Sequence, residues 1–132
     1  MRAFREAVET GDLKAVEALL ADDVVFTSPA VFKPYPGKAI TAAILGAVIQ
    51  VFEDFRYVRE IGAPDDADHA LVFTARVGDR ELTGCDFLHV NEEGLIDDFM
   101  VMVRPLSGAQ ALAEAMGARF EQIVKDAEAR SA

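Results

Sequence analysis

The sequence has little cysteine, few positive charges and no long apolar run, and each shortage excludes a class of protein. Its single cysteine, Cys85, cannot form a disulfide within the chain, which is typical of a reducing compartment. Lysine and arginine number 13 against 23 aspartates and glutamates, a net charge of −10. Nucleic acids and anionic membranes select basic surfaces, so neither is an expected partner. The longest apolar stretch, residues 42–51, is too short to span a bilayer.

The apolar residues that the chain does contain are sufficient for one core. A length of 132 residues is the size of a single domain, and 52% of the residues are hydrophobic, which excludes a disordered chain. No repeat or low-complexity tract divides the sequence, so we expect one domain over residues 1–132. The first residues open directly into a helical pattern without an apolar signal segment, and we therefore expect a cytoplasmic protein.

The first half of the chain is predicted to be mainly helical. Residues 1–9 have one apolar helical face that stops at Gly11, and Asp12 is the expected N-cap of a second helix. The expected inward positions of that second helix are Leu13, Val16, Leu19 and Leu20. A short strand over 24–27 follows, and then a proline-rich loop. The next helix, 38–52, has few polar positions, so we expect it to be covered on two sides.

From residue 55 onward the apolar residues recur with a period of two. The expected strands are 55–61, 70–77, 80–90 and 95–104, and short turns join them as in an antiparallel meander. Ser107 and Gln110 are spaced as a capping box for a last helix. Its expected inner face is Leu112, Met116, Phe120 and Val124. Together the elements predict an α+β roll with three N-terminal helices packed in a curved antiparallel sheet that encloses a pocket, and a C-terminal helix.

The turns predict which sheet residues share a face. A two-residue turn at Gly78-Asp79 places Leu71 opposite Asp86, and a four-residue turn over 91–94 places Phe99 opposite Asp86 on the other side. The predicted inner face is Leu71, Phe73, Ala75, Val77, Leu82, Gly84, Asp86, Leu88, Phe99, Val101 and Val103. The predicted outer face is Thr74, Arg76, Glu81, Thr83, Cys85, Phe87, His89, Asp98, Met100, Met102 and Arg104. Because the outer face is partly apolar, we expect a homodimer interface there.

Asp86 is the single carboxyl of the inner face and the candidate catalytic residue. Burial disfavours its charged form, so its pKa should be raised. Such a group can donate a proton, accept one, or hydrogen-bond a ligand carbonyl. It can equally be a structural carboxyl bonded to a buried Tyr, Arg or backbone N–H. The candidate ligand-binding residues around it are Phe4, Val8, Phe26, Tyr35, Phe52, Tyr57, Phe73, Phe99, Val101 and Val103, of which the two tyrosines could offer a hydroxyl.

The sequence lacks the residue patterns of metal sites, nucleophilic triads and nucleotide-binding loops. His69 and His89 have no partner at metal-ligand spacing, so no metal site is expected. No Ser-His-Asp set, phosphate-binding loop or dinucleotide fingerprint is present. Proton transfer needs no cofactor, and none is expected. The expected partner is a small, neutral, hydrophobic molecule, because an acidic protein repels acidic ligands at long range.

Several segments resemble the NTF2-like superfamily. They are residues 8–13, residues 21–29, Gly37-Lys38 at the start of a helix, and residues 86–96 in the expected meander. The branch that they resemble most contains the SnoaL-like polyketide cyclases, with ketosteroid isomerase and limonene epoxide hydrolase as relatives. The resemblance covers nearly the whole chain and implies a cone-shaped roll around a pocket. It does not fix the function, because one fold hosts many activities.

The resemblance also shows which family residues are missing. Ketosteroid isomerase uses a tyrosine and a protonated aspartate as an oxyanion hole and a second aspartate as base. By resemblance Asp86 stands for the oxyanion-hole aspartate, but Phe4 stands at the tyrosine position and Ser28 at the base position. Steroid-type isomerisation is therefore not supported, and Val101 replaces an acid that limonene-type epoxide hydrolysis needs. What remains resembles the SnoaL-like cyclases, in which a lone aspartate is acid and base, and Ser28 joins the expected pocket residues.

Three hypotheses stay open from the sequence. The chain is an isomerase, cyclase or lyase in which Asp86 transfers a proton. Alternatively, it binds a small ligand without catalysis, and Asp86 anchors a polar group of that ligand. In the third hypothesis it is a structural dimer whose own side chains fill the interior.

Overall fold

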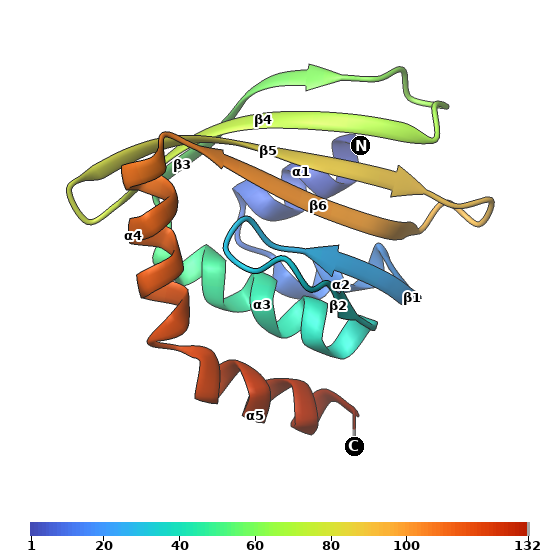
Figure 1. The fold of residues 1–132 in the computed structure, drawn as a ribbon. Coiled ribbons are helices and arrows are strands. Elements are labelled where there is room, and N and C mark those ends of the chain that lie inside the picture. Colours follow the sequence, from blue (N-terminus) through green and yellow to red (C-terminus); the bar gives the residue numbers. More distant parts are fainter. Residues whose placement is uncertain (132) are drawn as a thin grey trace.

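A computed structural model describes residues 1–131, in which a curved six-stranded sheet packs against helices on its concave side (Figure 1). The strand order is β2-β1-β6-β5-β4-β3. The strands are β1 (Leu20–Thr27), β2 (Tyr35–Pro36), β3 (Glu53–Ile61), β4 (Asp68–Val77), β5 (Arg80–Val90) and β6 (Ile96–Arg104). The four predicted meander strands are confirmed, each with its boundaries within two residues of the prediction.

The sheet is mixed, so the prediction of a wholly antiparallel sheet is wrong. Strand β1 lies parallel to β6, whereas β2 is antiparallel to β1 and the meander β3 to β6 is antiparallel throughout. A parallel neighbour needs a long connection, and here helix α3 and the whole meander separate β1 from β6 in the sequence. Strand β1 also begins at Leu20, which the sequence placed in the preceding helix, and Leu20 pairs with Ile96.

Five helices accompany the sheet in the described part of the chain. They are α1 (Arg2–Glu9), α2 (Leu13–Ala18), α3 (Lys38–Val51), α4 (Leu106–Gly117) and α5 (Phe120–Ser131). The predicted cap of α2 is confirmed, since the Asp12 carboxylate accepts a hydrogen bond of 3.2 Å from the backbone N–H of Ala15. Helix α3 follows Gly37, whose φ of 105° favours glycine at that position.

The C-terminal segment forms two helices, which corrects the prediction of one. Helix α4 ends at Gly117, and α5 begins at Phe120 and lies alongside α3 (Figure 1). The change of direction buries Ile123 and Ala127, while Phe120 stays 43% exposed. The predicted capping box is also absent, because α4 already begins at Leu106 and has no side-chain cap. Ser107 therefore lies inside the first turn of α4.

Within residues 1–131, no helix combines the length and the apolar character that a membrane span requires.

The Asp12 cap predicts a measurable loss of stability. Asp12→Ala removes an acceptor for the first turn of α2, and such a change costs about 1 kcal/mol. Urea unfolding followed by circular dichroism should show this decrease in the free energy of unfolding. The matched control is Asp23→Ala, since Asp23 is exposed in β1 and should change stability by less than about 0.5 kcal/mol. Equal effects of the two substitutions would contradict the capping role.

Candidate functional site

Asp86 lies on the inner face of β5 and is only 6% exposed. Its cross-strand neighbours are Leu71 on β4, as the turn predicts, and Val101 on β6. The prediction that Phe99 lies opposite Asp86 is wrong, since Phe99 pairs with Leu88. An irregularity at the β5–β6 turn moves this register by two residues. A shift by two leaves every side chain on its predicted face, so Asp86 still has apolar neighbours on both sides.

Tyr57 is the hydrogen-bond partner of this carboxyl. Its hydroxyl donates to Oδ2 of Asp86 over 2.7 Å, and the tyrosine itself is only 5% exposed. Tyr57 belongs to β3, two strands away from β5, and its long side chain reaches across the inner face of the sheet. Within residues 1–131, no other group donates a hydrogen bond to the Asp86 side chain. Oδ1 therefore receives no hydrogen bond from the described residues.

Burial sets the protonation of both groups. Loss of hydration raises the pKa of Asp86 to about 7, although the hydrogen bond from Tyr57 acts in the opposite direction. Burial first, and then the charge and hydrogen bond of Asp86, raise the pKa of Tyr57 far above its usual value. Tyr57 therefore remains a hydrogen-bond donor at neutral pH. With its pKa raised to about 7, the Asp86 carboxyl can both give and take a proton.

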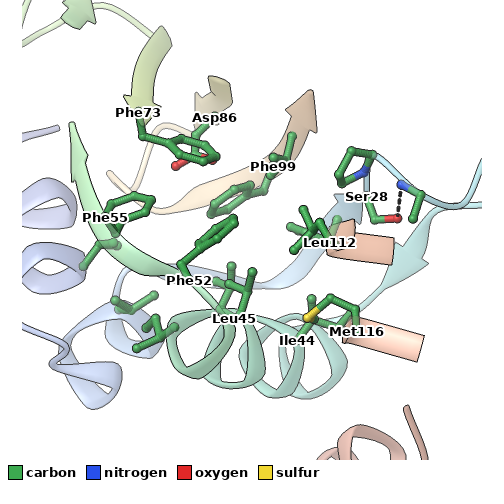
Figure 2. A pocket seen from close by; sticks show the side chains of 18 of the residues that line it. Ser28, Ile44, Leu45, Phe52, Phe55, Phe73, Asp86, Phe99, Leu112 and Met116 are labelled. Carbon is green, nitrogen blue, oxygen red and sulfur yellow. Dashed lines mark hydrogen bonds between the residues drawn. The ribbon is translucent and has the colours of Figure 1, made fainter. Parts of the chain in front are cut away.

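An apolar cavity of about 490 Å³ opens beside Asp86. Figure 2 shows Asp86 next to Phe73 at one end, Phe52 and Phe99 between, and Ile44 and Met116 at the other end. The predicted ligand-binding residues that line the cavity are Phe4, Val8, Phe26, Ser28, Tyr35, Phe52, Tyr57, Phe73, Phe99 and Val101. The cavity thus lies on the predicted inner face of the sheet, between β strands and helices.

Val103 is the predicted ligand-binding residue that is not among the residues lining the cavity. It points to the same side of β6 as Val101 but lies two residues nearer the end of the strand. Helix α4 packs over that end of the sheet (Figure 1), so Val103 is partly buried against the core. The alternation of a strand identifies a face, and it does not show where a helix covers that face.

The helices supply cavity residues that were not among the predicted ligand-binding residues. Helix α3 contributes Ile44, Leu45, Val48 and Ile49, and the C-terminal helices contribute Leu112, Met116, Phe120 and Ile123. The strongly apolar composition of α3 indicated two covered sides, and one of them is the cavity. Phe55 was also missed, and it lies in β3 where the register with β4 is irregular, between Glu53 and Arg56.

An aromatic cluster surrounds the Tyr57–Asp86 pair on the sheet side. The ring of Phe55 lies 5.0 Å from that of Tyr57 and 4.9 Å from that of Phe73, measured between centroids. Phe73 can lie across β5 because its partner there is Gly84. A Cβ atom at Gly84 would collide with the Phe73 ring. Gly84 therefore allows the Phe73 ring to pack across β5 on the inner face of the sheet.

Two other polar residues of the cavity, Ser28 and Tyr35, do not contact Asp86. The Ser28 hydroxyl accepts hydrogen bonds from the backbone N–H groups of Ala30 and Val31, so it stabilises its own loop. Tyr35 is partly buried and faces Phe120, with ring centroids 6.5 Å apart. Over the described residues, no group of three or more His, Cys, Asp or Glu side chains is placed to hold a metal ion.

Solved structures resemble this chain over nearly its whole length. A protein of Silicibacter pomeroyi DSS-3 with a cystatin-like fold is 40% identical, has a TM-score of 0.89, and the match covers 99% of this chain and 92% of that one. A steroid delta-isomerase of Pseudomonas aeruginosa is 43% identical with a TM-score of 0.85, covering 92% and 89%. A polyketide cyclase proposed for Pseudomonas putida KT2440 is 20% identical with a TM-score of 0.66, covering 81% and 90%, and shares the fold.

These neighbours and the roll around a cavity define an NTF2-like α+β protein. The model of the SnoaL-like domain matches residues 1–99, and the chain belongs to this SnoaL-like family. Among curated proteins, none matches it.

The raised pKa of Asp86 predicts a characteristic pH dependence of stability. Between about pH 4, where an unfolded aspartate titrates, and about pH 7, the folded chain keeps a proton that the unfolded chain has released. Asp86 therefore lowers the free energy of unfolding as pH rises through this range, by on the order of 4 kcal/mol. Urea unfolding of wild type and Asp86→Asn at several pH values isolates this contribution. Parallel curves for the two proteins would contradict the raised pKa.

Proposed function

We propose that this chain binds a small, neutral, largely hydrophobic carbonyl compound in its cavity, and that Asp86 transfers a proton to and from it. The reaction class is a cofactor-free isomerisation or cyclisation of the SnoaL-like type. One observation carries the proposal: a buried carboxyl, held by Tyr57 through one oxygen, offers its other oxygen to an apolar cavity.

The size and walls of the cavity support the proposed ligand class. A volume of about 490 Å³ lies within the usual range of small-molecule pockets. Phenylalanine, valine, leucine and isoleucine side chains dominate the lining, so a charged ligand would lose its hydration without gaining partners. A carbonyl group can hydrogen-bond the protonated Asp86, and an apolar ring system can occupy the remaining volume.

The proposed proton transfer uses both protonation states of Asp86. In its ionised form, Oδ1 removes a proton from the carbon next to the ligand carbonyl, which leaves an enolate. The newly protonated carboxyl then returns that proton to a different carbon, so the ligand is isomerised and Asp86 is regenerated. The pKa of about 7 suits both steps, because a catalytic group works best near the ambient pH. Tyr57 keeps Oδ2 occupied and orients the carboxyl.

The similarity to a steroid delta-isomerase at 43% identity supports an isomerase function. This support is stronger than that from the family resemblance of the sequence segments. That resemblance placed Phe4 and Ser28 at positions where ketosteroid isomerase has polar groups. In the structure, Tyr57 supplies a tyrosine hydroxyl from β3, next to Asp86. A tyrosine–aspartate pair is thus present in the cavity, but its tyrosine comes from β3 and not from the position of Phe4.

Ligand binding without catalysis is the second candidate function. The observation that favours it is the absence of a second acid inside the cavity in residues 1–131. Glu9 is the other acidic residue of the lining, but it is exposed and bonded to Arg5. The third hypothesis, an interior filled by the chain's own side chains, does not agree with the open cavity.

Asp86→Asn separates the two functions. A β,γ-unsaturated steroid ketone is a suitable first probe, because its conjugated product absorbs in the ultraviolet. The substitution should lower kcat by about 10²- to 10⁴-fold, since asparagine cannot take a proton, while the thermal unfolding curve remains cooperative. Asp65→Asn removes a carboxylate from an exposed loop and should leave kcat unchanged.

The outcomes of this assay distinguish the proposals. Full activity in folded Asp86→Asn would exclude the proton transfer. Binding of the probe, measured by calorimetry, without turnover by the wild type would favour the binding function. Binding by neither protein, tested with several neutral polycyclic ketones, would contradict both.

Tyr57→Phe tests the hydrogen bond separately. The Tyr57 hydroxyl lowers the pKa of Asp86, so its loss should raise that pKa further. Turnover that depends on ionised Asp86 should then reach half of its maximum at a higher pH. The matched control is Tyr35→Phe, which removes a hydroxyl from the same cavity without touching Asp86. A pH profile that is the same in Tyr57→Phe and wild type would show that Tyr57 has no such role.

A further inference from the structure

Tyr35 differs from the other polar residues of the cavity, because its side chain has no hydrogen-bond partner in the described part of the chain. Six polar residues line the cavity, namely Glu9, Thr10, Ser28, Tyr35, Tyr57 and Asp86. Glu9 and Thr10 are bonded to other groups of α1, and Ser28 is bonded to its own loop. Tyr57 and Asp86 are bonded to each other. Within residues 1–131, the Tyr35 hydroxyl forms no hydrogen bond.

Tyr35 and Asp86 lie far apart on the inner face of the sheet. Tyr35 on β2 pairs with Phe26 on β1, Phe26 pairs with Phe99 on β6, and Phe99 pairs with Leu88 on β5. Paired residues share a face of the sheet, and so do residues two apart in one strand, such as Leu88 and Asp86. Three strand spacings separate β2 from β5, which amounts to about 14 Å. The two side chains therefore approach one cavity from widely separated positions.

The part of the sheet between these two residues is apolar. The rings of Phe26 and Phe99 occupy it, with their centroids 5.3 Å apart, and both residues line the cavity. A ligand that reaches from Asp86 to Tyr35 must therefore be long and apolar in its middle. A rigid skeleton of fused rings meets this requirement better than a flexible chain, because it loses less conformational entropy on binding.

The cavity reaches the surface of the molecule beside Tyr35. Tyr35 is partly buried, and its ring packs against that of Phe120. Phe120 and Val31 both line the cavity and are exposed. Water can therefore bond the Tyr35 hydroxyl in the free protein, and an oxygen of a ligand can take the place of this water. Asp86 is only 6% exposed, so a ligand that enters beside Tyr35 reaches Asp86 with its leading end and leaves its trailing end at Tyr35.

We propose that the Tyr35 hydroxyl hydrogen-bonds a second oxygen of the ligand, so that the cavity selects rigid polycyclic ketones with a hydroxyl or carbonyl group at the end opposite the reacting carbonyl. This contact rests on the proposed function, because Asp86 must engage the first carbonyl. A tyrosine hydroxyl can donate a hydrogen bond to a carbonyl oxygen and can also accept one from a hydroxyl. Tyr35 is thus a specificity-determining residue and takes no part in the proton transfer.

Calorimetric titration with two saturated steroid ketones tests the proposal without requiring turnover. One ketone has a single carbonyl at one end of its skeleton, and the other has an additional hydroxyl at the opposite end. The wild type should bind the hydroxylated ketone about threefold to tenfold more tightly, as expected for one net hydrogen bond. Tyr35→Phe keeps the ring, so it should lose this preference while its affinity for the simple ketone stays at the wild-type value.

Thr10→Val is the matched control. It removes another hydroxyl of the cavity lining, one that already bonds a backbone carbonyl of α1, and it should keep the wild-type preference. With the corresponding β,γ-unsaturated ketones, Tyr35→Phe should raise KM for the hydroxylated substrate by the same factor and leave kcat unchanged, because the contact is equal in the ground state and the transition state. Thermal unfolding checks that each variant is folded.

Three results would overturn the role of Tyr35. They are a wild type that does not prefer the hydroxylated ketone, a preference in Tyr35→Phe equal to that of the wild type, and an equal loss of preference in Thr10→Val. Binding of neither ketone would contradict this role together with the proposed ligand class. The proton transfer is tested separately by Asp86→Asn, so its failure would leave the calorimetric preference unchanged, and a missing preference would leave turnover of the simple ketone unchanged.

Discussion

The rest of the site depends on the balance between dehydration of the Asp86 carboxyl and its hydrogen bond to Tyr57. Dehydration alone would keep the carboxyl protonated, and a full set of donors would keep it ionised. One donor at 2.7 Å leaves the pKa at about 7. This balance requires the burial of Asp86, which is 6% exposed between Leu71 and Val101. The apolar packing of the sheet therefore determines the chemistry that the carboxyl can do.

Strand β5 connects the cavity with the opposite surface of the molecule. Asp86 points into the cavity, while its sequence neighbours Cys85 and Phe87 point to the outer face. Because alternate residues of a strand serve opposite faces, the two faces are built independently within eleven residues.

The sequence predicted the local features of the fold and failed where distant segments meet. The two-residue turn at Gly78-Asp79 determined the pairing of Leu71 with Asp86. The bulge beside His89 has no comparable signal, yet the inner face was correct, since the shift is even. The partnership of Tyr57 and Asp86 could not be predicted, because two irregularities interrupt the register of β3 with β4. Gly117 was a usable signal for the break between α4 and α5.

The sequence predicted the residues that line the cavity only in part, because no residue pattern distinguishes a wall of an empty cavity from a wall of a packed core. The apolar character of α3 is the same whether side chains or a ligand cover it. What distinguishes a ligand cavity from a packed core is the position of a polar group that the fold leaves incompletely bonded. Oδ1 of Asp86 is such a group, since Tyr57 occupies only Oδ2 and the cavity adjoins it. A buried acceptor without a hydrogen bond costs about 1–3 kcal/mol, and Tyr57 satisfies one of the two oxygens. A donor on a ligand would therefore complete the bonding of this carboxyl, as the proposed function requires.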